Sequence, residues 1–134
     1  HPSAQEGNRI SASLNHDLVF HGSARGDQEL IDLYSQANVT VVPSREDNMP
    51  IAAMESQSCG TPVVAFKIGG LSDIVDPTFS GYLAKPEDTR DLAQGIMEVL
   101  SQDLRESTRE HALATWSPGV IVPQLLSVYQ EVLS

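Results

Sequence analysis

The sequence has little of several residue types, and each shortage excludes a class of protein. Its single cysteine, Cys59, leaves no disulfide framework and no cysteine-based metal site to be built within the chain. Lysine and arginine total 8 against 18 acidic residues, a net charge of −10, so we expect no nucleic-acid partner. No apolar run approaches the roughly 18 residues that a membrane-spanning helix needs.

What remains is the composition of a globular domain. The chain has 134 residues, of which 40% are hydrophobic and 19% charged, enough for one hydrophobic core. Residues 1–16 are polar and aperiodic, so we predict a flexible N-terminal segment there and a domain over residues 17–134. The sequence begins at His1 without an initiator methionine, which we interpret as a sign of a longer protein.

Short apolar runs alternate with segments of helical periodicity along this domain. We expect strands at residues 18–22, 39–43, 62–66 and 81–84. Helices are expected from Asp27, between the second and third strands, from Asp88, over 103–113 and after Ser117. Strands that are apolar on both faces and alternate with helices are typical of parallel sheets. The sequence therefore predicts an α/β fold, a Rossmann-like parallel sheet with flanking helices.

Two acids, Asp47 and Glu55, flank the start of the helix that follows the strand at 39–43. Ligands of such sheets bind outside the carboxyl ends of the strands, where residues 44–50 lie. We expect Asp47 or Asn48 to cap this helix, with Pro50 in its first turn and the positive end of the helix dipole facing outward. A carboxylate at Glu55 could then accept hydrogen bonds from vicinal hydroxyls such as those of ribose. The pattern leaves a second interpretation open, in which Asp47 is only a cap and Glu55 an ordinary helix residue.

Several short motifs carry a family resemblance. They are Val42-Pro43-Ser44, Asp47-Asn48-Met49-Pro50, Met54-Glu55, Cys59-Gly60-Thr61-Pro62-Val63-Val64-Ala65 and Gly69-Gly70. In this order and spacing they resemble the C-terminal domain of GT-B glycosyltransferases of family 4 (group 1), of the polysaccharide-biosynthesis type. Two acids separated by seven residues mark that family, and Asp47 and Glu55 have this spacing, with Asp47 in place of the commoner Glu.

The resemblance implies a retaining glycosyltransferase that moves a sugar from a nucleotide-sugar, with UDP, GDP or ADP as its nucleotide, to an acceptor hydroxyl. Glu55 would hold the ribose and Asp47 the donor sugar, which makes these acids the candidate catalytic residues. The expected substrate-binding residues are Gly22, Ser23, Ala24, Ser44, Asn48, Met49, Pro50, Ile51, Gly69 and Gly70. From the pattern alone, Gly69-Gly70 fits a simple turn equally well. We expect neither a metal ion nor a cofactor.

The family pattern has parts without a counterpart here. These are two further strands, an Arg–Lys pair that neutralises the donor diphosphate, and the N-terminal acceptor domain, so we predict that the chain alone cannot transfer sugar. Absent strands would leave a strand edge unpaired. We therefore expect either a homodimer through that edge or packing of residues 18–22 against the next strand. The expected location is the cytoplasm, with attachment to a membrane surface in the case of a lipid acceptor.

Two other functions compete with the transferase. One is a non-catalytic Rossmann-like nucleotide-binding or interaction module, and the other is a GT-B epimerase or phosphorylase. The acid pair together with the Cys-Gly-x-Pro-Val-Val-Ala segment favours a transferase over an epimerase. The presence of both acids, Asp47 and Glu55, favours an active enzyme over a module that has lost its catalytic function.

Overall fold

The computed structural model describes residues 17–134, so the predicted flexible segment at 1–16 lies outside the described residues. The chain divides into two compact units, residues 1–30 and residues 31–134, each with its own internal contacts. All three strands and the candidate site built around Asp47 and Glu55 belong to the second unit.

A three-stranded parallel sheet forms the centre of the second unit. Its strands are β1 (Thr40–Val42), β2 (Val63–Phe66) and β3 (Gly81–Ala84), in the order β1-β2-β3. All four residues of β2 are buried, as expected for a central strand with both faces covered. Three of the four predicted strands are thus confirmed, with β3 at the predicted bounds.

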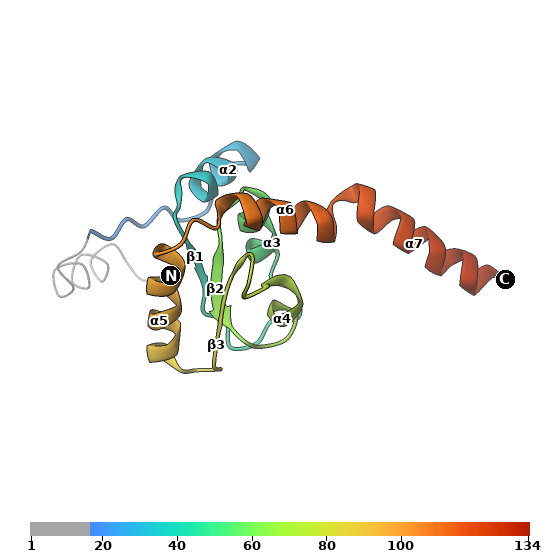
Figure 1. Cartoon of the computed structure of the whole chain (residues 1–134). Helices are drawn as coiled ribbons and strands as arrows, with labels where there is room; N and C mark the ends of the chain where they lie inside the picture. The colour runs from blue at the N-terminus through green and yellow to red at the C-terminus, as the bar shows by residue number, and fades with distance from the viewer. Residues whose placement is uncertain (1–16) are drawn as a thin grey trace. The chain divides into compact units, whose positions relative to one another are not determined.

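Helices cover both faces of this sheet. The helices of residues 17–134 are α2 (Asp27–Gln36), α3 (Ile51–Ser58), α4 (Leu71–Ile74), α5 (Thr89–Leu100), α6 (Arg105–Trp116) and α7 (Pro118–Leu133), and of these α3 and α5 pack directly on the strands. Figure 1 shows α5 on one side of the strands, with α3 and α4 on the other. Helix α5 packs on β2 and β3, whereas α3 packs on β1 and β2 and also against α6. The predicted α/β class, a parallel sheet with flanking helices, is confirmed.

The main core lies between the sheet and the α3–α4 layer. Its buried members are Val42, Ala53, Val63, Ala65, Leu71, Ile74 and Val75. Burial of an aliphatic side chain of this size contributes about 1.5–3 kcal/mol to folding. Two polar contacts tie the same layer together, because the Ser56 hydroxyl lies 2.8 Å from the Thr40 hydroxyl and donates to the Thr61 carbonyl at 2.9 Å. These contacts fix α3 relative to the amino ends of β1 and β2.

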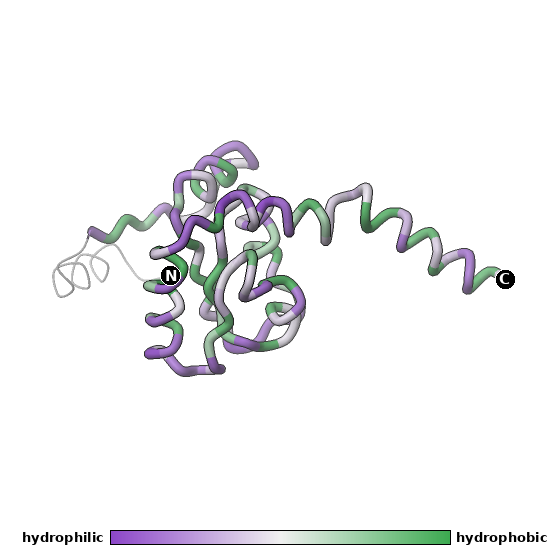
Figure 2. Tube along the Cα trace, viewed as in Figure 1, coloured by the Kyte–Doolittle hydropathy of each residue, from purple (hydrophilic) through white to green (hydrophobic). Residues whose placement is uncertain are grey.

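Helix α7 carries many exposed apolar side chains. Pro118 takes its first turn, as the sequence predicts, and none of its residues is buried. Figure 2 shows green, hydrophobic residues recurring along it. They include Ile121, Val122, Leu125, Leu126, Val128, Tyr129, Val132 and Leu133. Within residues 17–134, neither α7 nor any other helix combines the length and apolar character required to cross a membrane.

The predicted strand at residues 18–22 is wrong. These residues have no regular secondary structure, and β1, β2 and β3 make up the sheet of the described residues. A short apolar run cannot by itself distinguish a strand from another extended segment, because a strand exists only with a hydrogen-bonded neighbour. Residues 18–22 and the strands belong to different units, so packing of these residues against the next strand stays a prediction. A homodimer through a sheet edge stays a prediction.

The junction between β3 and α5 is held by two aspartates. Asp88 is the N-cap of α5, as predicted, and its Oδ1 accepts from the amides of Arg90 at 3.1 Å and Asp91 at 3.0 Å. The Tyr82 hydroxyl donates to Oδ1 of Asp91, and the Lys85 amide donates to Oδ2, both at 2.7 Å. The hydrogen bond from Tyr82 and, to a smaller extent, that from the Lys85 amide lower the pKa of Asp91. The bond between Tyr82 and Asp91 also raises the pKa of Tyr82 to about 12.

The lowered pKa of Asp91 predicts an acid-dependent loss of stability. A carboxylate whose pKa is depressed on folding stabilises the protein above its unfolded pKa, and this contribution disappears as the pH falls through the folded value. We therefore expect Asp91→Asn to lower the free energy of unfolding at pH 7, with a gap to wild type that closes below the ordinary pKa of 3.8. Urea unfolding between pH 3 and 7 measures this gap. A gap of constant size across that range would contradict the assignment.

Candidate functional site

The loop after β1 lies at the carboxyl edge of the sheet and leads into α3. Asp47 Oδ1 accepts a hydrogen bond from the Met49 amide at 3.1 Å, which folds the loop on itself. Pro50, with φ −72° and ψ 102°, is the N-cap of α3, so the predictions that Asp47 or Asn48 caps the helix and that Pro50 lies in its first turn are both wrong. The extended ψ of Pro50 delays the first helical residue to Ile51. Because proline has no side-chain acceptor, the first amides of α3 are not capped by it.

The two glycines after β2 lie directly against this loop. In the parallel register Val42 of β1 is opposite Ala65 of β2, which brings the two following loops to the same edge. A Cβ added at Gly69 would lie 2.0 Å from the Asp47 carbonyl oxygen, and one at Gly70 would lie 2.1 Å from that of Asn48. Only residues without a side chain permit so close an approach. Gly69-Gly70 therefore does more than turn the chain, because it supports the Asp47–Asn48 backbone.

Glu55 lies in the second turn of α3, is half-buried, and contacts Tyr34 of α2. Its Oε2 accepts a hydrogen bond from the Tyr34 hydroxyl at 3.3 Å. Burial raises the pKa of Tyr34, and the charge and hydrogen bond of Glu55 raise it further. Among residues 17–134 no recorded hydrogen bond or ion pair joins Asp47 to Glu55 directly, so the two acids act from separate elements.

Sequence reasoning missed the contact between Tyr34 and Glu55. Tyr34 fits the apolar face of the helix that begins at Asp27, and nothing in its local pattern marks a hydrogen bond to a residue 21 positions away. The predicted helix start at Asp27 itself is confirmed by the bounds of α2.

The remaining predicted residues divide between the two units. In the second unit Asn48, Met49 and Ile51 are exposed, Ser44 and Gly70 are half-buried, and Pro50 is buried. Gly22, Ser23 and Ala24 are exposed residues of the first unit, and Gly22 has a φ of 68°, a conformation that suits glycine. Their expected part in substrate binding stays a prediction.

An apolar cavity of about 590 Å³ adjoins the loop at Met49. Its walls come from α3, α4 and the junction of α6 with α7. The lining residues are Met49, Met54, Asp73, Ile74, Thr115, Trp116, Pro118, Ile121 and Val122. The cavity has few polar groups, so it does not itself provide the hydrogen-bonding partners that a sugar or a phosphate requires.

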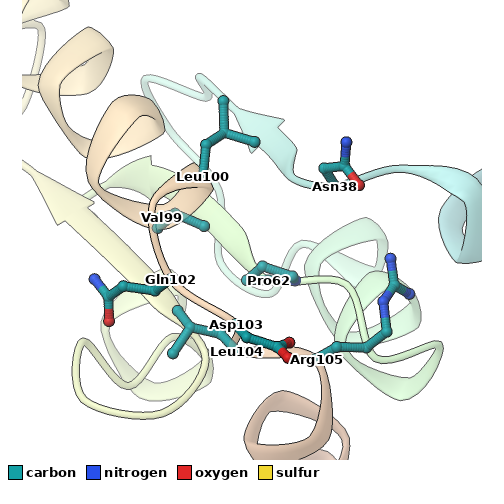
Figure 3. A pocket seen from close by; sticks show the side chains of 8 residues that line it. All are labelled: Asn38, Pro62, Val99, Leu100, Gln102, Asp103, Leu104 and Arg105. Atoms are coloured by element: carbon teal, nitrogen blue, oxygen red, sulfur yellow. The ribbon is translucent and has the colours of Figure 1, made fainter.

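A second cavity, of about 290 Å³, lies at the opposite edge of the sheet (Figure 3). Asn38 and Pro62, which line it, come just before β1 and β2, and the other lining residues come from the end of α5 to Arg105. Arg105 is already engaged there, because its guanidinium donates to the carbonyls of Ala37 at 2.8 Å and Ser35 at 3.1 Å. Ligands of parallel sheets bind at the carboxyl ends, and none of the predicted site residues lines this cavity.

The arrangement at the carboxyl edge can hold a ligand rich in hydroxyl groups and negative charge. Asp47 and Glu55 supply carboxylate oxygens that accept hydrogen bonds from hydroxyls. The start of α3 supplies amide donors and the positive end of a helix dipole, which attract an anion. The close packing of Gly69-Gly70 keeps the loop in one position, so these groups are arranged before a ligand arrives.

Comparison with known proteins identifies the family. Residues 6–114 match the family model described as Glycosyl transferases group 1. A D-inositol 3-phosphate glycosyltransferase of Saccharomonospora viridis is 36% identical over 115 residues, which cover 82% of this chain and 26% of that protein. A protein of the same name from Streptosporangium roseum is 43% identical over 106 residues, covering 78% of this chain and 23% of the relative. The chain thus spans about a quarter of the length of these relatives.

A solved structure agrees with this match. The sucrose-phosphate synthase of Thermosynechococcus elongatus superposes with a TM-score of 0.76 at 30% identity, over 96% of this chain and 34% of the synthase. The sheet with its flanking helices therefore matches part of a GT-B glycosyltransferase structure. Because the family model covers most of the sequence, including Asp47, Glu55 and Gly69-Gly70, the chain belongs to the group 1 glycosyl transferases.

Proposed function

We propose that this chain is the donor-binding half of a retaining glycosyltransferase. The enzyme transfers a sugar from a nucleotide-sugar to an acceptor hydroxyl, and the acceptor-binding half lies in another part of the protein. One observation carries the proposal. The loop that holds the first family acid, Asp47, lies against Gly69-Gly70 at the carboxyl edge of the sheet, beside the start of the helix that holds the second acid, Glu55.

Each part of this edge has a task toward the donor. Glu55 accepts hydrogen bonds from the ribose hydroxyls. Asp47 uses Oδ1 to hold the Met49 amide, and its second carboxylate oxygen accepts from a hydroxyl of the donor sugar. The amides at the start of α3 face the diphosphate, which carries the growing negative charge as it leaves. Such help is needed because the chain has a net charge of −10.

Positioning and electrostatics supply the catalysis in this proposal. The bond between C1 of the sugar and the diphosphate oxygen breaks, and the nucleoside diphosphate takes the electron pair. The acceptor oxygen forms the new bond to C1 on the same face and passes its proton to the diphosphate oxygen that leaves. A site that fixes donor and leaving group in advance lowers the barrier without a covalent nucleophile. Asp47 and Glu55 therefore act on the donor and need not bond to it.

The acceptor class has two sources of support. The relatives are named for an inositol phosphate, which favours a hydroxyl of a phosphorylated polyol. The Asp-Asn-x-Pro form of the motif favours the hydroxyl of a growing polysaccharide. Both are hydroxyl acceptors, so the donor half serves either.

Replacement of Glu55 tests the donor site. We expect the protein at its full natural length to bind one of UDP, GDP and ADP selectively, and Glu55→Gln to weaken that binding. One hydrogen bond to a charged group contributes about 1.5–3 kcal/mol, which corresponds to a loss of roughly 10- to 100-fold in affinity. Calorimetric titration with the three nucleotides and their glucose conjugates measures this loss.

Glu46→Gln is the matched control. Glu46 is exposed and has a carboxylate, as Asp47 and Glu55 do, but it precedes Asp47 by one residue and so does not have the family spacing to Glu55. It should leave nucleotide affinity within twofold of wild type. If a folded full-length protein binds none of the nucleotides, the donor-site proposal fails and a non-catalytic Rossmann-like module takes its place. Conversion of a sugar nucleotide without any acceptor would identify an epimerase instead.

A further inference from the structure

The hydrogen bond between Tyr34 and Glu55 links the predicted ribose-binding carboxylate to a second helix. Tyr34 lies near the end of α2 and Glu55 in the middle of α3, and both side chains are half-buried. The hydroxyl donates to Oε2 of Glu55 at 3.3 Å. Because the pKa of Tyr34 is raised by burial and by Glu55, the hydroxyl keeps its proton and remains a donor at neutral pH.

Tyr34 is itself firmly held by the backbone around it. Its carbonyl oxygen accepts from the hydroxyl of the fully buried Thr61 at 2.5 Å. Arg105 donates to the carbonyls of Ser35 and Ala37 on either side of the helix end. A side chain on a fixed backbone offers a rigid partner, whereas one on a frayed helix end does not.

The contact leaves Glu55 with room for a ligand. A carboxylate has about four positions at which it accepts hydrogen bonds, and Tyr34 occupies one of them. Within residues 17–134, no other donor to Glu55 is recorded. Both oxygens thus keep acceptor capacity for a pair of vicinal hydroxyls, while the Tyr34 bond fixes the plane of the carboxylate.

We propose that Tyr34 is a positioning residue, which holds the Glu55 carboxylate in the orientation that accepts both ribose hydroxyls and so makes the site select ribonucleotides over 2′-deoxyribonucleotides. This inference rests on the proposed donor site. It adds to the acid motif a residue outside it, Tyr34, and a preference for ribose over 2′-deoxyribose that the motif alone does not predict. A carboxylate free to rotate would still accept one hydroxyl but would lose the paired geometry.

The test compares ribose with 2′-deoxyribose ligands in two variants. The protein at its full natural length is titrated with its preferred nucleoside diphosphate and with the 2′-deoxy form of the same nucleotide. We expect wild type to prefer the ribose form by about tenfold, since the deoxy form lacks one hydrogen bond to a charged group. Tyr34→Phe should weaken binding of the ribose form about threefold to tenfold and change the deoxy form less than twofold. The ratio of the affinity for the ribose form to that for the 2′-deoxy form then falls toward one.

Tyr82→Phe is the matched control. It also removes a tyrosine–carboxylate hydrogen bond, the 2.7 Å contact with Asp91, but at the β3–α5 junction. We expect it to lower the melting temperature and to leave the ribose preference at its wild-type value. A purely structural role for Tyr34 predicts equal losses for both ligands, so equal losses, or none, would overturn the inference.

The same titrations separate failure of the inference from failure of the donor site. If wild type binds a nucleotide and Glu55→Gln weakens this binding, unchanged selectivity in Tyr34→Phe refutes the role of Tyr34 alone. If wild type binds no nucleotide, both proposals fall. Circular dichroism of Tyr34→Phe shows whether the fold is kept. If Tyr34→Phe unfolds, Tyr34→His is tested in its place, because histidine retains a hydrogen-bond donor. A wild-type ribose preference in the folded Tyr34→His protein then supports the positioning role of Tyr34. A lost preference overturns it.

Discussion

Replacing Gly81 with alanine is expected to unfold the sheet of residues 31–134. Gly81 begins β3 and pairs in register with Val63 of the central strand. A Cβ at this position would lie 1.8 Å from the Val63 carbonyl oxygen and 3.0 Å from its nitrogen. Both atoms belong to the backbone, so no rotation of a side chain relieves the clash. The backbone at Gly81, with φ 155°, is moreover one that residues with a side chain rarely adopt.

The size of the effect follows from where the clash falls. β2 is buried along its whole length, and β3 must move away from it to make room, which opens the ladder between them. A domain of this kind is stable by only about 5–15 kcal/mol, and a backbone clash in a buried sheet costs a large part of that. We expect Gly81→Ala to lose its cooperative urea transition and much of its far-ultraviolet circular dichroism.

Gly119→Ala provides the comparison for Gly81→Ala. Gly119 lies in the first turn of α7, and a Cβ there would meet no heavy atom within 4 Å. Alanine favours a helix over glycine by about 0.5–1 kcal/mol, so this variant should be as stable as wild type or slightly more stable. A Gly81→Ala protein with the wild-type urea midpoint would show that β2 and β3 do not pair as described.

Local sequence signals predict the parts of this fold that depend on neighbours along the chain. The strand at 81–84 consists of a glycine followed by a short apolar run, and it forms where the sequence predicts it. Asp88 caps α5 because its side chain reaches amides two and three residues ahead. The positions of Asp47 and Glu55 around the start of α3 are also visible in the sequence, since a strand, a loop and a helix follow one another there.

Contacts between distant residues are what the sequence does not reveal. The apolar run at 18–22 looks like a strand, yet whether it becomes one depends on a partner elsewhere in the chain. Tyr34 and Glu55 meet only because the fold brings α2 beside α3, whereas the sequence pattern shows only that Tyr34 lies on the apolar face of its own helix. The support of the Asp47 loop by Gly69-Gly70 arises in the same way, from the parallel register of β1 and β2.

Gly70→Ala is expected to cause a large loss of donor binding through a single added methyl group. The φ of Gly70 is −67°, which alanine adopts without strain, so any effect comes from the added carbon alone. That carbon would lie 2.1 Å from the Asn48 carbonyl oxygen and 3.3 Å from the Met49 Cα. The loop between β1 and α3 must therefore shift away, and Asp47, whose carboxylate holds the Met49 amide, shifts with it.

A displacement of about 1 Å in groups that position a substrate can reduce the rate of a catalysed reaction by about 100-fold, and a loss of donor affinity of the same order is expected here. We expect that loss in titrations of the full-length protein with its preferred nucleotide-sugar, while the free energy of unfolding falls by only about 1–3 kcal/mol, as for other overpacked sites. Gly69→Ala combines the same clash with a φ of 43°, so it should lose more stability for a similar loss of binding. Wild-type affinity in a folded Gly70→Ala protein would mean that the loop takes no part in the donor site. The two variants together distinguish a loop that positions the donor from one that only completes the fold, because only the first predicts that affinity falls much further than stability.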